Sequence, residues 1–309
     1  MLRATLLSAA RSAQVRTLVE NAPVSRSVVK RFVPGTSVAD AVRASAGIVG
    51  SGRLVSLDRL GKNTTDRAHA EATRDSYLEL LRALGEAGLT HAVEVSVKLS
   101  AVGQSLEGDG EKIALDNTRT ICEQATALGT TVTLDAEDHT TTDSTLSILR
   151  QLRVDFPDTG AVVQSYLRRT EGDCRDLAGP RSRVRLCKGA YREPESVAFQ
   201  GKEDVDLSYV RCLKILMAGE GYPMVASHDP RLVEIAGTLA VRHGRVPGSY
   251  EYQMLFGVRP EEQKRLAAAG ERLRVYTPYG EEWYGYFMRR LAERPANVAF
   301  FLRSLVSKG

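Results

Sequence analysis

Polar and ionisable side chains recur at the ends of short apolar runs, and these positions are the first candidates for chemistry. Lys98, Asp135 and Arg185 are typical, since each lies in or closes a run of β-branched and apolar residues. Buried charge is costly unless it is paired or used. We therefore expect a functional ring instead of isolated structural hydrogen bonds. Its other members are Glu137, Asp138, His139, Gln164, Ser165, Tyr166, Lys188, Ser227, His228, Asp229, Gln253 and Tyr276.

A second candidate is the segment Glu281–Glu293, which carries two adjacent arginines on a predicted helix. Acidic residues occupy its first turn and Arg294-Pro295 ends it, as helix signals require. At about 100° per residue, Arg289 and Arg290 share a face with Tyr286. Two guanidiniums form a good clamp for a carboxylate, because each offers planar bidentate donors. A solvated face with an internal ion pair is the alternative that the pattern leaves open.

Composition indicates a globular protein with a large core. The chain has 309 residues, of which 43% are apolar and 26% charged, close to average usage. Lys and Arg (42) nearly balance Asp and Glu (38), so the surface is mixed and we expect no nucleic-acid partner. The longest apolar runs are shorter than the roughly 20 residues that a membrane span needs.

Cysteine and histidine spacing argues against a disulfide framework and against a metal site. The four cysteines include no CxxC pair, and the five histidines include no HxH or HExxH motif. We therefore predict reduced thiols in a cytoplasmic protein and no bound metal.

Eight short β-branched runs alternate with amphipathic segments, which predicts a closed parallel α/β barrel in which the candidate residues gather at the carboxyl ends of the strands. A glycine-rich fingerprint after the first strand, typical of an open doubly wound sheet, is absent, because Gly50-Ser51-Gly52 precedes that strand. The predicted strands are Arg53–Leu57, Ala92–Leu99, Thr131–Glu137, Ala161–Tyr166, Arg183–Cys187, Met224–His228, Tyr250–Leu255 and Leu273–Tyr276. The predicted helices between them are Asp66–Ala87, Asp116–Leu128, Asp143–Arg153, Val205–Ala218, Pro230–Val241 and Pro260–Ala269.

The first residues form a separate region. Met1–Val19 has three arginines and no acid, and its leucines and valines fit one face of a helix laid against the domain. An amphipathic transit peptide is the alternative. We predict a helical arm over residues 1–45 and a catalytic barrel over residues 46–309.

Taken together, the segments at the strand ends and on the last helix resemble the proline dehydrogenase family in its short monofunctional bacterial form. They run in family order from about residue 53 to 305, whereas residues 1 to about 45 carry no such motif. The segments are Val97-Lys98-Leu99-Ser100, Leu134-Asp135-Ala136-Glu137, Gln164-Ser165-Tyr166, Arg185-Leu186-Cys187-Lys188-Gly189-Ala190-Tyr191, Ala226-Ser227-His228, Tyr250-Glu251-Tyr252-Gln253-Met254-Leu255, Tyr276-Thr277-Pro278-Tyr279-Gly280 and Tyr286-Phe287-Met288-Arg289-Arg290-Leu291.

The resemblance implies a distorted (β/α)8 TIM-type barrel whose last helix caps the active site. It implies non-covalent FAD and oxidation of L-proline to Δ1-pyrroline-5-carboxylate by hydride transfer to the flavin, the first step of proline degradation to glutamate. It also implies a quinone at the membrane as electron acceptor, contact with the inner face of the membrane that is at most peripheral, and a separate pyrroline-5-carboxylate dehydrogenase that takes the product.

The resemblance also assigns roles to residues. Asp135 and Arg185 hold the catalytic positions, with Arg185 beside the flavin ring. The substrate-binding positions are Lys98, Arg289 and Arg290 for the carboxylate, and Tyr276, Tyr286 and Leu255 around the pyrrolidine ring. The FAD-binding positions are Ala136, Gln164, Arg185, Lys188, Gly189, Ala190, Ser227 and His228.

One motif departs from the family. Where many members have Leu-Gly-Glu, with an acid that pairs with the helix arginine as a gate, this chain has Leu60-Gly61-Lys62. Asp58 and Asp66 are the nearby acids that could replace the gate.

Two other functions remain open. A Schiff-base aldolase-type barrel could use Lys98 or Lys188, since a desolvated lysine is a usable nucleophile. A catalytically silent barrel could bind membranes or partners through the basic first segment.

Overall fold

The computed structural model describes residues 29–61 and 64–293. The predicted N-terminal arm before residue 29, Lys62 of the gate motif and the residues after 293 lie outside the described residues.

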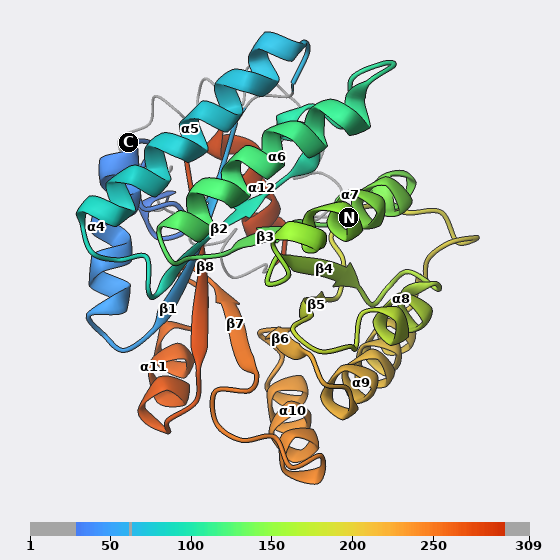
Figure 1. The fold of residues 1–309 in the computed structure, drawn as a ribbon. Coiled ribbons are helices and arrows are strands. Elements are labelled where there is room, and N and C mark those ends of the chain that lie inside the picture. Colours follow the sequence, from blue (N-terminus) through green and yellow to red (C-terminus); the bar gives the residue numbers. More distant parts are fainter. Residues whose placement is uncertain (1–28, 62–63, 294–309) are drawn as a thin grey trace, which may run out of the picture.

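Eight parallel strands close into a barrel in chain order, with β1 hydrogen-bonded to β8 (Figure 1). This arrangement confirms the predicted TIM-type barrel. The strands are β1 Leu54–Arg59, β2 Val93–Val97, β3 Val132–Leu134, β4 Gly160–Gln164, β5 Arg183–Cys187, β6 Tyr222–Ala226, β7 Glu251–Leu255 and β8 Leu273–Tyr279.

Helices surround the strands (Figure 1). They are α4 Val38–Val49, α5 Arg67–Glu86, α6 Gly110–Ala127, α7 Thr142–Asp155, α8 Thr170–Asp176, α9 Lys202–Ala218, α10 Pro230–Arg242, α11 Pro260–Ala268 and α12 Trp283–Glu293, with short 3-10 turns at Leu99–Val102 and His139–Thr141. Several begin at a side-chain cap. Ser37 and Asp40 form a capping box on α4, while Asp66 and Asp229 accept N–H bonds at the starts of α5 and α10.

Three helices show clear differences from the sequence-based expectation. Helix α6 begins six residues earlier than predicted, at Gly110, where a side chain would come within 2.7 Å of the Gln104 carbonyl oxygen. Helix α8 was not predicted, because seven mostly polar residues carry too little apolar periodicity to indicate a helix. Helix α4 runs across the predicted boundary between residues 45 and 46 and buries Ala41 and Ile48, so the two-part division stays a prediction.

The main apolar core lies between the strands and the outer helices. On β1 the outward residues Val55 and Leu57 belong to this core, whereas Ser56 between them belongs to the polar interior. The same alternation on β2 places Val93 and Val95 in the core on either side of Glu94. Strands buried on both faces usually read as continuous apolar runs. The alternation therefore marks a barrel whose interior is built for polar contacts.

Helix α12 covers the carboxyl end of the barrel, as predicted. Tyr284, Tyr286 and Phe287 form a second apolar cluster with Leu60, and Val258 packs against it. Leu60 follows the end of β1 and Val258 follows the end of β7, so both mark the carboxyl edge. The last helix is thus placed over the strand ends that carry the candidate residues.

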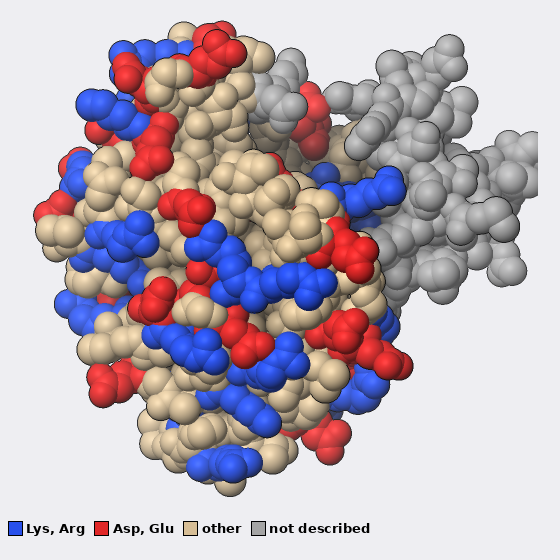
Figure 2. Space-filling view, turned by 90° about the vertical axis from the view of Figure 1, so that its right-hand side faces the viewer, with Lys and Arg blue, Asp and Glu red and all other residues tan. Residues whose placement is uncertain are grey.

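The surface carries both signs of charge. Figure 2 shows Lys and Arg interspersed with Asp and Glu over one face of the barrel, in keeping with the formal net charge of +4. Within residues 29–61 and 64–293, no helix is both long and apolar enough to span a bilayer.

Candidate active site

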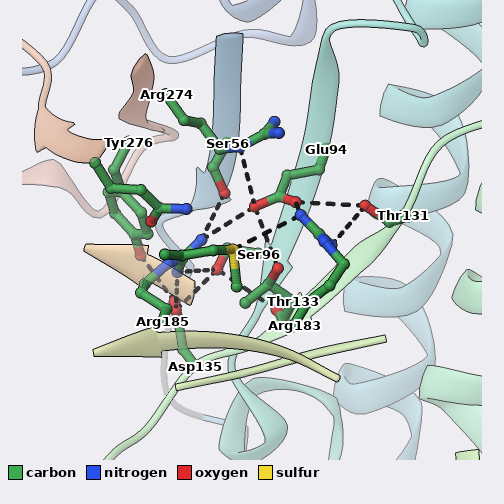
Figure 3. A network of polar contacts seen from close by, with 12 residues as sticks. Ser56, Glu94, Ser96, Thr131, Thr133, Asp135, Arg183, Arg185, Arg274 and Tyr276 are labelled. Atoms are coloured by element: carbon green, nitrogen blue, oxygen red, sulfur yellow. Dashed lines mark hydrogen bonds and ion pairs between the residues drawn. The ribbon is translucent and has the colours of Figure 1, made fainter. Parts of the chain in front are cut away.

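Asp135 is the centre of a polar network at the carboxyl end of β3 (Figure 3). Its Oδ1 accepts hydrogen bonds from Ser96 Oγ and from Arg185 Nη1, both at 2.8 Å. Its Oδ2 accepts from the Tyr276 hydroxyl at 2.8 Å and lies 3.7 Å from Lys98 Nζ. One buried carboxylate therefore ties together residues from β2, β3, β5 and β8.

Lys98 is held as a cation between two carboxylates. Its ammonium donates a short hydrogen bond to Asp58, which is 1% exposed at the end of β1, and it faces Asp135 on the other side. Burial lowers the pKa of Lys98, but the charges of Asp58 and Asp135 outweigh burial and the net pKa lies above the ordinary lysine value. Lys98 is thus a permanent positive charge at the barrel mouth.

Arg185 uses both ends of its guanidinium. Nη1 donates to Asp135 and Ser96, and Nη2 donates to Ser56 Oγ at 3.0 Å and to Glu94 Oε1 at 3.2 Å. Arg185 Nε is buried without a hydrogen-bond partner in the part of the chain that the structure describes. A buried N–H of this kind suits a ligand acceptor, because native structures rarely leave such donors unused.

Tyr276, one of the three residues predicted to surround the pyrrolidine ring, belongs to this network. The Tyr276 ring stacks below the Arg185 guanidinium, 5.2 Å from its centroid. Burial, followed by the charge of Asp135, raises the pKa of Tyr276 well above that of a free tyrosine, so its hydroxyl is a proton-bearing donor. Tyr286 on α12 is buried, and Leu255 is half-buried at the end of β7.

The two arginines of α12 occupy different environments. The Arg290 guanidinium lies 5.1 Å from the centroid of the Tyr286 ring, and Arg289 is exposed. Burial, followed by Glu137, raises the pKa of Tyr191 to about 12, while the charges of Lys98 and Arg289 act in the opposite direction. Tyr191 therefore lies within electrostatic range of both the α12 clamp and the strand-end lysine.

Among the predicted flavin positions, Gln164, Ser227 and His228 have their side chains fixed by backbone groups. Gln164 Nε2 donates to the Glu137 carbonyl oxygen at 2.8 Å, and Ser227 Oγ accepts from the Asp229 N–H at 3.1 Å. His228 Nε2 accepts a hydrogen bond from the backbone N–H of Leu255 at 2.8 Å. Ala136 is half-buried beside them.

The strip that follows β5 is held by neighbouring side chains. Lys188 Nζ is paired with Asp206 at 2.5 Å and with Asp229 at 3.5 Å. Gly189 has a φ of +115°, and a side chain there would come within 2.3 Å of the Tyr166 ring. Both the backbone conformation and the neighbouring ring therefore favour glycine at this position. Ala190 is exposed.

The two acids considered as replacements for the gate are engaged elsewhere. Asp58 is bound by Lys98, and Asp66 accepts the His69 N–H at 2.8 Å as the cap of α5. Lys62 lies outside the described residues.

Sequence reasoning missed the charged residues deeper in the barrel. Glu94, Glu251 and Arg274 are each at most 7% exposed and are joined by ion pairs. The missed signal is a polar residue at every second strand position, as in Glu94-Val95-Ser96-Val97-Lys98. In a barrel this spacing places all of the polar residues on the inner face.

A second buried cluster, also missed, ties the loop after β5 to neighbouring strands. Glu193 is 7% exposed and accepts the His139 N–H at 2.9 Å, a short hydrogen bond from the His139 ring and the Tyr166 hydroxyl at 3.3 Å. Among the described residues, no group of three or more His, Cys, Asp or Glu side chains is arranged to hold a metal ion. Cys122, Cys174, Cys187 and Cys212 are free thiols.

Comparison with known proteins agrees with this geometry. The family model described as proline dehydrogenase matches residues 41–303. Proline dehydrogenase of Deinococcus radiodurans is 39% identical over 282 residues, which are 91% of this chain and 90% of that protein. Proline dehydrogenase 1 of Bacillus subtilis (strain 168) is 37% identical over 284 residues, which are 92% of each.

The fold matches that of a larger protein. A crystal structure of proline utilization A from Bdellovibrio bacteriovorus, inactivated by N-propargylglycine, superposes with a TM-score of 0.79 and 25% identity. The match covers 86% of this chain and 32% of that one, so the present chain spans about a third of that protein. Because the family match includes every strand of the barrel together with α12, this chain belongs to the proline dehydrogenase family of oxidoreductases.

Proposed function

We propose that this protein oxidises L-proline to Δ1-pyrroline-5-carboxylate, as the first step in the degradation of proline to glutamate. The observation that carries the proposal is the Asp135 carboxylate, held by Lys98, Arg185 and Tyr276 at the end of the barrel where α12, the helix that bears the arginine pair, packs. Membership of the proline dehydrogenase family supports the same reaction.

Charge balance explains how this site would bind a zwitterion. Lys98 is matched by Asp58, and Arg185 is matched by Glu94 and Asp135, so the floor of the site carries little net charge. Further positive charge for a substrate carboxylate would come from α12, where Arg289 and Arg290 stand on adjacent positions. Guanidinium–carboxylate pairs form charge-assisted, bidentate hydrogen bonds. The proline carboxylate would therefore bind under α12, with Lys98 completing the clamp.

Asp135 is better suited to orient groups than to remove a proton. Its two oxygens already accept three hydrogen bonds and face a lysine cation. Such a carboxylate stabilises positive charge nearby. The ring nitrogen of proline would lie close to it, with Tyr276, Tyr286 and Leu255 excluding water from the apolar ring.

The residues present fit non-covalent FAD, because Arg185 keeps one buried N–H for a ligand acceptor and brings a positive charge to the strand ends. When bound, the flavin supplies the acceptor for the hydride that leaves the carbon next to the proline nitrogen. The cation of Arg185 would stabilise negative charge on the reduced ring. The residues that would hold the cofactor are Ala136, Gln164, Arg185, Lys188, Gly189, Ala190, Ser227 and His228.

Electron transfer and product removal complete the proposal. A membrane quinone would accept the electrons, with a cytoplasmic protein making peripheral contact with the inner face of the membrane. The product would pass to a separate pyrroline-5-carboxylate dehydrogenase. These partners rest on the family resemblance.

The geometry disfavours the Schiff-base alternative. A nucleophilic lysine needs a lowered pKa, whereas that of Lys98 is raised by Asp58 and Asp135. Lys188 is likewise paired with Asp206 and Asp229.

The experiment is an anaerobic titration of purified protein with L-proline, followed by the flavin spectrum. We expect about one FAD per chain, bleached by proline. In Arg289→Met and Arg290→Met, kcat/KM should fall roughly ten- to over a hundredfold with flavin content unchanged, because a charge-assisted hydrogen bond contributes about 1.5–3 kcal/mol. Arg→Lys at either position should restore only part of the loss.

Arg265→Met is the matched control, since Arg265 is an exposed arginine paired with Glu262 on α11. It should leave kcat/KM unchanged. A flavin that stays oxidised at saturating proline would refute the substrate, and wild-type efficiency in both α12 variants would place the carboxylate elsewhere.

A further inference from the structure

We propose that Glu94 is a positioning residue for the reaction, acting through Arg185, whose guanidinium it holds from the side opposite Asp135. The inference rests on the proposed function, because Arg185 is the group that would act on the bound flavin. It concerns the barrel interior below the substrate site.

Glu94 is the meeting point of groups from several strands (Figure 3). Its side chain, 1% exposed on β2, accepts Arg185 Nη2 at 3.2 Å and Thr133 Oγ1 at 3.2 Å through Oε1. Its Oε2 accepts Arg183 Nη2 at 2.6 Å and Thr131 Oγ1 at 3.4 Å. Each carboxylate oxygen is thus committed to one arginine and one threonine, which fixes the carboxylate plane.

The charges in this interior are equal in number among the described residues. Arg183, Arg185 and Arg274 face Glu94, Glu251 and Asp135. Burial raises the pKa of Glu94, but the three arginines outweigh it and the net pKa lies below the ordinary value, so the group stays ionised. Glu94 is the only carboxylate in this described set that contacts all three arginines.

Arg185 depends on Glu94 for its orientation. Its guanidinium is held at Nη1 by Asp135 and at Nη2 by Glu94, with Ser96 and Ser56 as the neutral acceptors at the two ends. A carboxylate at each end fixes the rotation of the guanidinium and hence the direction of its unused Nε–H. Without Glu94, only Ser56 would hold Nη2, and the group would turn toward Asp135.

Glu251 provides a matched control. It is 0% exposed, pairs with Arg274 at 2.7 Å and belongs to the same interior, but no hydrogen bond or ion pair joins it to Arg185, both being described residues. A Glu251 variant therefore loses an ion pair that is as deeply buried as those of Glu94, but it does not release Arg185. This separates a loss of positioning from a general effect on the barrel.

The experiment compares Glu94→Gln with Glu251→Gln as flavin-loaded proteins. In Glu94→Gln we expect the rate constant of anaerobic flavin reduction at saturating L-proline to fall about tenfold. The Kd of tetrahydro-2-furoate, a ring carboxylate without the amine, should stay within threefold of wild type. The flavin midpoint potential, measured by dye-coupled reduction without proline, should move to a more positive value, because Arg185 loses one of its two counter-charges. Glu251→Gln should keep the wild-type rate within about threefold.

Ser56→Ala tests the same Nη2 end of the Arg185 guanidinium without changing any charge, and it keeps the proposal open to refutation where Glu94→Gln does not fold. It should lower the rate of flavin reduction about threefold with unchanged affinity for tetrahydro-2-furoate. The proposal is overturned by a Glu94→Gln rate and potential equal to wild type, by an equal rate loss in Glu251→Gln, or by a wild-type rate in Ser56→Ala. Failure of the proposed function itself is distinct, since the wild-type flavin would then resist bleaching by proline.

Discussion

Replacing Asp135 by Asn tests the centre of the site with almost no change in shape. The amide keeps an acceptor for Ser96 and Arg185 at the Oδ1 position, but it turns the Oδ2 acceptor into an N–H₂ donor. That donor would face the Lys98 ammonium at 3.7 Å, which can only donate, and the Tyr276 hydroxyl at 2.8 Å, which would have to turn from donor to acceptor. The substitution therefore loses the ion pair with Lys98, reverses the hydrogen bond with Tyr276 and leaves Arg185 with Glu94 as its one remaining charged partner.

The magnitude follows from these contacts. Breaking a buried ion pair by removing one partner costs about 3–5 kcal/mol. For domains of 150–250 residues, 1 kcal/mol corresponds to roughly 2–4 °C in Tm, so we expect Tm to fall by roughly 6–20 °C. A misplaced Tyr276 and Lys98 should also cost about 3 kcal/mol in the transition state, or roughly a hundredfold in kcat/KM.

The assays are thermal unfolding and anaerobic flavin reduction by L-proline. Asp116→Asn is the control, because Asp116 forms an exposed ion pair with Lys112 on α6, and such pairs contribute about 0–1 kcal/mol. If Asp135→Asn unfolds within 2 °C of wild type and keeps kcat/KM within threefold, the network around Asp135 is neither structural nor catalytic.

Two further predictions concern protonation. The folded-state pKa of Lys98 is raised, so its ion pairs contribute fully below the unfolded value of about 10.4 and are lost only as pH rises through the folded value. Reduction with borohydride in the presence of pyruvate at pH 8 should therefore leave the protein mass unchanged, and an adduct on Lys98 would contradict this. A side-chain hydrogen bond from Arg231 is the main cause that lowers the pKa of Asp229 to about 2. Its contribution is present above the unfolded value of about 3.9 and is lost as pH falls toward 2. Asp229→Asn should lower Tm at pH 6. The difference in Tm between the variant and wild type should become smaller between pH 4 and pH 3, and a difference that does not change with pH would refute the assignment.

The fold was largely predictable, because β-branched runs indicate the strands and capping residues indicate where helices begin. The prediction for β5, Arg183–Cys187, matches the structure at both ends, and Pro230 marks the start of α10. The expected third strand was too long. It ends at Leu134. The Asp135 N–H still donates to the Val97 carbonyl oxygen at 2.9 Å, but the Glu137 carbonyl oxygen accepts from the Gln164 side chain instead of from a neighbouring strand.

The site was predictable in its identities and less so in its contacts. Asp135, Lys98 and Arg185 meet at the mouth of the barrel, as residues at the ends of neighbouring parallel strands must. Several of their hydrogen-bond and ion-pair partners lie deeper in the barrel than the strand ends. An analysis of the residues at strand ends alone cannot identify them. Asp58 was considered only as a replacement for the gate acid, and its pairing with Lys98 depends on a register between β1 and β2 that no local pattern encodes.

The outer face of the barrel strands contributes mainly to stability, and the inner face carries the polar residues of the proposed chemistry. The outer face packs valines and leucines against the helices, where loss of a large side chain costs about 2–5 kcal/mol through the cavity that it leaves. On the inner face, ion pairs such as Arg274–Glu251 displace apolar packing, and buried pairs of this kind are often no more stable than apolar residues of the same volume. These buried ion pairs add little to stability, so their role is to hold the polar residues of the site, such as Arg185, in place. Substitutions such as Leu57→Ala should accordingly lower Tm while sparing the flavin reduction rate. Substitutions inside the barrel that release Arg185 should affect that rate beyond their effect on Tm.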